Sequence, residues 1–314
     1  MGRGVVLAQF EFVVPPSLTL PLKGGRGRRG RVPQAPIIFD RKLLAVRRAR
    51  ARKLGPATFL LDRVADELAE RLAAVLRRFE RAADIGTPTD AVRRALAGKV
   101  GAIADVVADE EALPFAPGSL DLVVSGLALQ FVNDLPGTLI QVRRALKPDG
   151  LFLAALIGGE SLTELRQAFA AAEAEIEGGV SPRVAPFADL RDLGALLQRA
   201  GFTLPVTDVD RVSVRYASPL DLMHDLRRMG AGNALAERRR VPLRRATLKR
   251  MMEIYAERFA GADGRVAVTF EIVWLSGWAP HESQQQPLAP GSAKARLADA
   301  LRTQEIPAGE KPGR

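Results

Sequence analysis

The stretch that decides the fold runs from Ala108 to Gly159 and has the sequence ADEEALPFAPGSLDLVVSGLALQFVNDLPGTLIQVRRALKPDGLFLAALIGG. It contains a short apolar run rich in β-branched residues at Asp121–Ser125, and seven consecutive apolar residues at Leu151–Ile157. Continuous apolar runs of this length are typical of strands that are covered on both faces of a parallel sheet. The two runs therefore predict two buried strands.

A helix is predicted between these strands. Asn133 or Asp134 can cap its N-terminus, and Pro136 suits its first turn. Apolar residues then recur at helical spacing, at Leu135, Leu139, Val142 and Leu146. Lys147–Gly150 (KPDG) has the composition of a turn. A strand, a helix and a strand within about forty residues predict a right-handed crossover between parallel strands, and hence an open α/β sheet.

Several phrases in and around this stretch occur together in one known class of protein. The first set is Asp109-Glu110 ahead of Leu113-Pro114-Phe115, the strand that follows, and Leu146–Gly150 (LKPDG). The second set is VNDLPG at 132–137, GGESLTELR at 158–166 and GWAPHES at 277–283. The first set resembles the second half of a class I S-adenosylmethionine-dependent methyltransferase. With the second set, the chain from about Phe39 to Leu301 resembles the family of mitochondrial complex I assembly factor 5, an arginine hydroxylase. That family includes alphaproteobacterial relatives and lies near the BioC methyltransferases.

The resemblance implies a Rossmann-like α/β fold. Its sheet is open, twisted and mostly parallel, with an antiparallel terminal strand and helices on both faces. It also implies S-adenosylmethionine as the cofactor. A basic helix is predicted at Arg41–Lys53, and a second helix is predicted after Thr58. Its core-facing stripe would be Leu60, Leu61, Val64, Leu68, Leu72 and Leu76. The first strand is then expected at Arg81–Ile85.

The C-terminal half has weaker but usable patterns. Ser161-x-x-Glu164 has the spacing of a capping box, and a further helix is predicted from Leu190 to about Gly201. Phe202–Tyr216 and Val266–Leu275 predict outer strands, which the resemblance makes an antiparallel pair. Between them an arginine-rich helical insertion is expected. Four of its residues are predicted to pack on the sheet: Met251, Met252, Ile254 and Tyr255.

The loop after the first strand departs from the class pattern. The class has Asp-x-Gly-x-Gly-x-Gly, whose glycines let the backbone approach the cofactor. This chain retains Asp84 and Gly86, but Pro88 stands where another glycine is expected. The resemblance assigns Asp84 and Gly86 to cofactor binding. The lost glycines predict weakened or lost binding of S-adenosylmethionine.

A second departure follows at once. Only ten residues separate Gly98 from Asp109, too few for a strand, a helix and another strand. Either Val100–Ala104 is the second strand, with Asp105 as the acid that binds the ribose, or Val106–Ala108 belongs to a third strand. In both cases one helical connection is missing.

The other cofactor-binding candidates come from the resemblance. Asp109 and Glu110 correspond to the position where the class binds the adenine amino group with a carboxylate; the alternative is a surface acidic pair. Ser125 and Gln130 lie past the C-terminal end of the next strand, where open α/β sheets bind ligands. The family often has His-Trp where this chain has Gln130-Phe131, so no general base is assigned.

Charge divides the chain into an arm and a body. Residues 1–53 contain 13 Lys and Arg against Glu11 and Asp40, whereas the remaining residues contain 33 Lys and Arg and 34 Asp and Glu. The basic pI therefore describes the arm, and no specific nucleic-acid binding is expected of the body.

Three segments are predicted: a disordered basic arm at 1–38, a methyltransferase-like domain at 39–282 with its insertion at about 220–262, and a mostly disordered tail at 283–314. The arm can be a solvated tail, a mitochondrial presequence or an RNA contact.

Composition limits the chemistry. The chain has no cysteine and only His224 and His281, so neither a thiolate nucleophile nor a histidine-rich metal site is expected. No two-His-one-carboxylate set for a redox metal is evident in the sequence. No apolar run approaches the length that crosses a membrane.

Three functions remain open at the level of sequence. The first is S-adenosylmethionine-dependent methylation of an unknown acceptor, which needs orientation more than acid–base power. The others follow from the resemblance: arginine hydroxylation in complex I assembly, or a non-catalytic assembly role. The expected partner is a protein substrate or a respiratory complex subunit. The expected location is the bacterial cytoplasm or, alternatively, the mitochondrial matrix.

Overall fold

The computed structural model describes residues 36–106, 109–285 and 302–303. One compact unit extends to Pro280, and a second begins at His281. Most of the predicted basic arm and most of the predicted C-terminal tail lie outside the described residues. No helix in the described part of the chain is long and apolar enough to cross a membrane.

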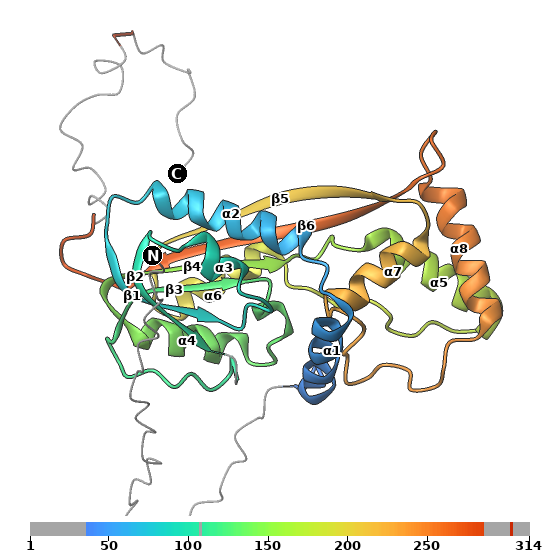
Figure 1. The fold of residues 1–314 in the computed structure, drawn as a ribbon, viewed down its shortest axis with the longest axis horizontal. Helices are drawn as coiled ribbons and strands as arrows, with labels where there is room; N and C mark the ends of the chain where they lie inside the picture. The colour runs from blue at the N-terminus through green and yellow to red at the C-terminus, as the bar shows by residue number, and fades with distance from the viewer. Residues whose placement is uncertain (1–35, 107–108, 286–301, 304–314) are drawn as a thin grey trace, which may run out of the picture. The chain divides into compact units, whose positions relative to one another are not determined.

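The described strands form one sheet of six strands in the order β2-β1-β3-β4-β6-β5 (Figure 1). Their bounds are β1 Phe79–Ile85, β2 Val100–Val106, β3 Leu120–Gly126, β4 Leu146–Ile157, β5 Thr203–Tyr216 and β6 Val266–Trp278. Strands β2, β1, β3 and β4 pair in parallel, whereas β6 runs antiparallel to both β4 and β5. The predicted Rossmann-like α/β sheet with an antiparallel terminal pair is confirmed.

Helices cover both faces of this sheet. Their bounds are α1 Arg41–Leu54, α2 Phe59–Ala73, α3 Ala91–Ala95, α4 Leu135–Ala145, α5 Thr163–Glu177, α6 Leu190–Arg199, α7 Pro219–Arg228 and α8 Arg245–Phe259, with a 3₁₀ turn η1 at Leu129–Phe131. Buried residues of α2, α5, α7 and α8 share one apolar cluster, and those of α4 and α6 share another with the opposite face of β3 and β4. Side chains alternate between the faces of a strand, so β3 and β4 contribute to both clusters.

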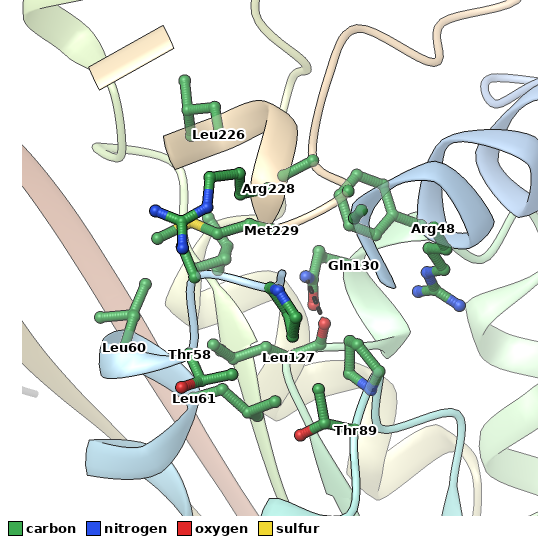
Figure 2. A pocket seen from close by; sticks show the side chains of 18 of the residues that line it. Arg48, Thr58, Leu60, Leu61, Thr89, Leu127, Gln130, Leu226, Arg228 and Met229 are labelled. Carbon is green, nitrogen blue, oxygen red and sulfur yellow. Dashed lines mark hydrogen bonds between the residues drawn. The ribbon is translucent and has the colours of Figure 1, made fainter. Parts of the chain in front are cut away.

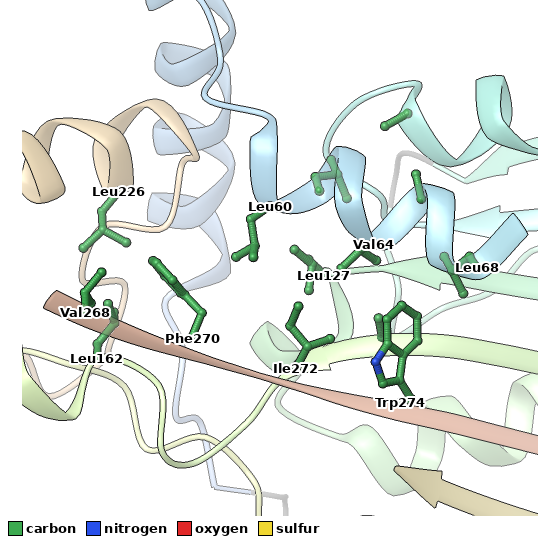
Figure 3. Close-up of a cluster of buried hydrophobic side chains, with 14 of the residues drawn as sticks. Leu60, Val64, Leu68, Leu127, Leu162, Leu226, Val268, Phe270, Ile272 and Trp274 are labelled. Carbon is green, nitrogen blue, oxygen red and sulfur yellow. The ribbon is translucent and has the colours of Figure 1, made fainter. Parts of the chain in front are cut away.

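Helix α2 packs across β6 in the larger cluster (Figure 3). Five of the six predicted stripe residues are buried there, namely Leu60, Leu61, Val64, Leu68 and Leu72. The prediction for Leu76 is wrong: the helix ends at Ala73, and Leu76 is fully exposed in the connection to β1. Helical periodicity has no meaning beyond the last helical turn.

Helix α4 begins as the sequence predicts. The Asp134 carboxylate accepts a hydrogen bond of 2.9 Å from the backbone N–H of Gly137, and Pro136 lies in the first turn. This cap satisfies one of the N–H groups that a helix N-terminus leaves without a partner.

The KPDG segment is a bulge within β4, not a turn that precedes the strand. Leu146 already pairs with Leu120, and pairing resumes between Leu151 and Leu122. Pro148 cannot donate a ladder hydrogen bond, and Asp149 adopts a positive φ of 62°. The segment therefore leaves the ladder and re-enters it without ending the strand.

The predicted capping box at Ser161 is also wrong. Helix α5 begins after Leu162, which adopts a positive φ of 58°. The Ser161 hydroxyl instead donates to the carbonyl of Glu271 at 3.1 Å and accepts from the N–H of Glu271 at 2.8 Å. The Glu164 carboxylate accepts from Thr269. Strand β6 supplies backbone partners that local sequence cannot reveal.

The predicted helical insertion consists of α7 and α8. Met251, Ile254 and Tyr255 are buried, and the Tyr255 hydroxyl donates to the carbonyl of Ala267 in β6 at 2.9 Å. Met252 is only half-buried. Helix α8 thus packs against the sheet, as predicted, and also lies against α5 (Figure 1).

Candidate functional site

The loop after β1 is pinned to the end of β3. Asp84 is buried, and its carboxylate accepts a hydrogen bond from the Thr87 hydroxyl. The same hydroxyl accepts a hydrogen bond of 2.9 Å from the backbone N–H of Gly126. Gly86 lies between these anchors with a φ of 70°, a conformation that favours glycine. The loop therefore has a defined shape although it lacks the other glycines of the class.

Helix α1 is fixed beside this loop. The Asn133 side chain accepts hydrogen bonds from the N–H groups of Ile38 and Phe39 at 2.9 and 2.7 Å. Asp40 caps the helix by accepting from Leu43 N–H. That hydrogen bond, together with the charge of Arg238, holds the pKa of Asp40 below its ordinary value. The VNDLPG segment thus positions α1 at the carboxyl ends of the parallel strands.

Two arginines of α1 bind the acidic segment that follows β2. Arg41 contacts Asp109 at 3.0 Å and Glu111 at 3.3 Å, and it also pairs with Glu110. Arg48 donates to Glu110 at 3.1 Å. The side chain of Glu110 is only 8% exposed, whereas that of Asp109 is 52% exposed. Glu110 is therefore the buried centre of the cluster, and Asp109 faces its open side.

The Glu110 carboxylate also touches the loop after β1. A Cβ added at Gly86 would meet Glu110 Oε1 at 2.5 Å, closer than nonbonded atoms approach. Gly86 is thus required by its φ and by the closeness of Glu110. The carboxylate lies where the backbone of this loop would otherwise be open to a ligand.

An outer groove of about 370 Å³ lies between α1, the loop at Gly86 and the acidic segment. Its lining residues are Arg41, Lys42, Leu44, Ala45, Arg48, Arg52, Gly86, Thr87, Pro88, Asp109, Glu110 and Glu111. Parallel α/β sheets bind ligands at this edge, outside the carboxyl ends of their strands.

An inner cavity of about 90 Å³ adjoins the groove, since Arg48, Arg52 and Pro88 line both (Figure 2). Gln130 points into it and donates from Nε2 to the carbonyl of Leu127 at 2.8 Å. Gln130 Oε1 and Arg48 Nη2 are buried and have no hydrogen-bond partner among the described residues. Buried polar atoms are normally paired, so an acceptor and a donor left without partners indicate a ligand position.

The structure places the predicted site residues in two groups. Gly86, Asp109 and Glu110 line the outer groove, and Gln130 lines the inner cavity. Asp84 forms the base of the loop. The Ser125 hydroxyl is buried and donates to the carbonyl of Ile85 at 2.7 Å, so its hydrogen is already used within the sheet.

Asp105 lies within β2, with its backbone opposite Asp84 in the parallel register. The described residues between β2 and β3 contain no helix. This agrees with the predicted loss of one connection and with the assignment of Asp105 to the second strand. The Asp105 side chain lies outside the described residues.

Sequence reasoning missed Arg41, Arg48 and Thr87. The sequence predicts the basic helix without giving it a role, and it assigns no role to Thr87. Charge complementarity between this helix and Asp109–Glu111 was the available signal, although it does not indicate which arginine pairs with which acid.

Comparisons with known proteins agree with this architecture. A family model described as "Methyltransferase domain" matches residues 65–154. "Arginine-hydroxylase NDUFAF5, mitochondrial" of Danio rerio is 37% identical over 286 residues, which cover 83% of this chain and 89% of that protein. The chain belongs to the family of NDUFAF5 and malonyl-[acyl-carrier protein] O-methyltransferase.

Two further relatives show the breadth of this family. The NDUFAF5 of Rattus norvegicus is 36% identical over 334 residues, 96% of this chain and 97% of that protein. A malonyl-[acyl-carrier protein] O-methyltransferase of Gallionella capsiferriformans is 38% identical over 177 residues, 56% of this chain and 58% of that protein. Family membership confirms the resemblance found in the sequence, and it includes proteins named as hydroxylases and as methyltransferases.

A class I methyltransferase domain implies S-adenosylmethionine, which Asp109, Gln130 and Arg48 fit and Glu110 does not. Asp109 offers an exposed carboxylate at the mouth of the groove, and Gln130 and Arg48 offer unpartnered polar atoms deeper inside. One residue opposes the fit, because the Glu110 carboxylate lies against Gly86. Binding of the cofactor along this loop requires Glu110 to move.

Proposed function

We propose that this protein binds S-adenosylmethionine in the outer groove and the adjoining inner cavity and transfers its methyl group to an acceptor bound beside it. One observation carries the proposal. A groove with an exposed carboxylate, Asp109, continues into a cavity with two buried unpartnered polar atoms, at the carboxyl ends of parallel strands. Membership of a family that contains methyltransferases supports the same function.

When bound, S-adenosylmethionine supplies an activated methyl group on a sulfonium. The residues of this chain have binding and orienting roles. Asp109 can accept a hydrogen bond from an exocyclic amino group, and Gln130 Oε1 and Arg48 Nη2 can accept from and donate to polar groups within the cavity. Leu60, Leu61 and Leu127 exclude water from one side of it. Methyl transfer gains most of its acceleration from such positioning, so it does not require the histidine or cysteine that the site lacks.

Titration with S-adenosylmethionine by isothermal calorimetry tests this function. We expect saturable binding that Gln130→Leu weakens, because this substitution removes the buried acceptor and preserves the volume of the side chain. Gln198→Leu is the matched control, since Gln198 is exposed on α6. The proposal fails if millimolar cofactor gives no heat of binding, or if both variants weaken binding equally.

The second candidate is a role in assembly of respiratory complex I, as an arginine-hydroxylase-like or a non-catalytic protein. The specific observation in its favour is that the Glu110 carboxylate covers the loop at Gly86. Arg41 and Arg48 hold the carboxylate there. The naming of several family members as arginine hydroxylases also supports it. A protein that binds no S-adenosylmethionine but co-purifies with a complex I subunit would favour this function over methyl transfer.

A further inference from the structure

A second groove of about 360 Å³ lies between α1, α5 and α7. Its apolar floor comes from α5 and α7, through Leu165, Phe169, Met223 and Leu226. The loops at 183–187 and 231–234 close its sides. Its volume is in the range of small-molecule sites, which are mostly apolar and carry a few polar groups.

The polar groups of this groove are almost all arginines. Arg47, Arg50, Arg183 and Arg227 line it, and no acidic residue does so in the part of the chain that the structure describes. Arg183 is already neutralised, because its Nε donates to the buried carboxylate of Glu173 at 2.7 Å. For the other three, no ion pair with a described carboxylate is present.

The position of Arg47 is defined by its neighbours. Its guanidinium rests on the backbone of Gly232, where an added Cβ would meet Arg47 Nη1 at 2.7 Å. Burial, followed by the charges of Arg238 and Arg50, lowers the pKa of Arg47, and the charge of Asp40 opposes this. Asp40 is itself paired with Arg238 at 3.2 Å. Positive charge is thus concentrated at the groove without a matching acid, which an anionic ligand would relieve.

We propose that this groove is a binding site for a small amphipathic organic anion, whose carboxylate or phosphate is held by Arg47, Arg50 and Arg227 while its apolar body lies on the floor. Guanidinium groups bind carboxylates and phosphates through charge-assisted hydrogen bonds. The apolar floor distinguishes the groove from a purely solvated charge run, because it can desolvate an aliphatic or aromatic chain. The groove shares Phe131, Leu162, Phe187, Leu226 and Ala231 with the inner cavity, so its ligand lies beside the proposed methyl-transfer site.

The test uses the full chain and simple probes, without S-adenosylmethionine. Octanoate and octyl phosphate are titrated by calorimetry, together with acetate, which lacks the apolar body, and octylammonium, which reverses the charge. We expect saturable one-to-one binding of octanoate or octyl phosphate and none of acetate or octylammonium. Binding of octanoate alone assigns a carboxylate ligand, and binding of octyl phosphate alone assigns a phosphate. Equal binding of octylammonium, or no saturation by either anion, overturns the proposal.

Variants locate the site. The double substitution of Arg47→Gln and Arg50→Gln keeps good helix formers on α1 and should weaken binding by about tenfold or more, equivalent to about 1.4 kcal/mol. Lys53→Gln is the matched control, since it removes a charge from the same helix outside the groove. Gly232→Ala should also weaken binding, because the added methyl displaces the Arg47 guanidinium.

Equal weakening by Lys53→Gln would show that general charge, and not the groove, attracts the probe. Cofactor titration of the same variants is a separate measurement, so failure of one proposal is distinguishable from failure of the other.

Discussion

The carboxylate of Glu110 lies against Gly86, so that any side chain at position 86 would collide with it. Two guanidinium groups from α1 hold this carboxylate in place, Arg41 and Arg48. The contact joins the loop after β1 to the acidic segment after β2, the two elements from which a class I methyltransferase builds its cofactor site. Helix α1 therefore fixes Glu110 against this loop through the charges on one of its faces.

Removal of the Glu110 side chain should strengthen cofactor binding. Glu110→Ala frees the loop at Gly86 and removes ion pairs that compete with the ligand. The expected gain in affinity for S-adenosylmethionine is about fivefold, which corresponds to about 1 kcal/mol that is no longer needed to displace the carboxylate. Calorimetric titration measures it, with Glu111→Ala as the control, because Glu111 binds Arg41 without touching Gly86. A lower affinity in Glu110→Ala would identify this carboxylate as a ligand of the cofactor.

Asp109→Ala should abolish measurable binding of S-adenosylmethionine. Wild-type affinity is expected to be no tighter than about tens of micromolar, because each hydrogen bond lost with the missing glycines and helix contributes about 0.5–1.5 kcal/mol. Loss of the exposed carboxylate removes a further contact at the mouth of the groove. Asp66→Ala, on the exposed face of α2, is the control and should bind as wild type does. Tight binding that survives Asp109→Ala would place the cofactor elsewhere.

The buried carboxylate of Glu173 should make stability depend on pH. Burial alone raises the pKa of Glu173, but hydrogen bonds from Ser181 and the ion pair with Arg183 outweigh it and leave the pKa below its ordinary value. A lowered pKa in the folded state stabilises the fold above the unfolded-state value of about 4.3, and this contribution is lost as the pH falls through the folded-state value.

Glu173→Gln tests this linkage. At neutral pH it should lower the free energy of unfolding by about 3 kcal/mol, because it leaves Arg183 without its buried partner. The difference from wild type should shrink in acid, where the wild-type carboxylate also becomes neutral. Urea denaturation near neutral pH and below the ordinary glutamate pKa measures both values. Glu70→Gln, on the exposed side of α2, should behave as wild type at each pH, and a pH-independent difference for Glu173→Gln would contradict the assignment.

Strand β4 should not tolerate charge. Ala154 is fully buried between Ser125 of β3 and Leu275 of β6. Ala154→Asp buries a carboxylate without a partner and should cost several kcal/mol, a large part of the roughly 5–15 kcal/mol that stabilises a typical domain. The soluble fraction after expression, followed by thermal melting, reports the loss. Val206→Asp in the same sheet is the control, because Val206 is 58% exposed. A soluble and fully folded Ala154→Asp protein would contradict the central position of β4.

The sequence by itself determined the elements whose signals are local. Apolar runs and helical spacing predicted β3 and α4 close to their observed bounds, and the part of β4 from Leu151 to Ile157, because burial on both sheet faces and on one helix face leaves a recognisable pattern in the chain. The predicted loss of a connection after β2 also held, since a helical crossover has a minimum length that ten residues do not reach. The motifs and their order along the chain then indicated the family and, through it, the antiparallel pair of strands.

Only the tertiary structure decided the contacts between groups far apart in the chain. Ser161 bonds to Glu271 on β6 and not to its own helix, because a strand more than a hundred residues away supplies the partner. Arg48 reaches Glu110 for the same kind of reason, since α1 is brought over the acidic segment by Asn133. Pairing of side chains depends on where the backbone carries them, and a sequence pattern records the type of a group but not its partner. The local elements were therefore predictable, and the ion pairs that close the candidate site were not.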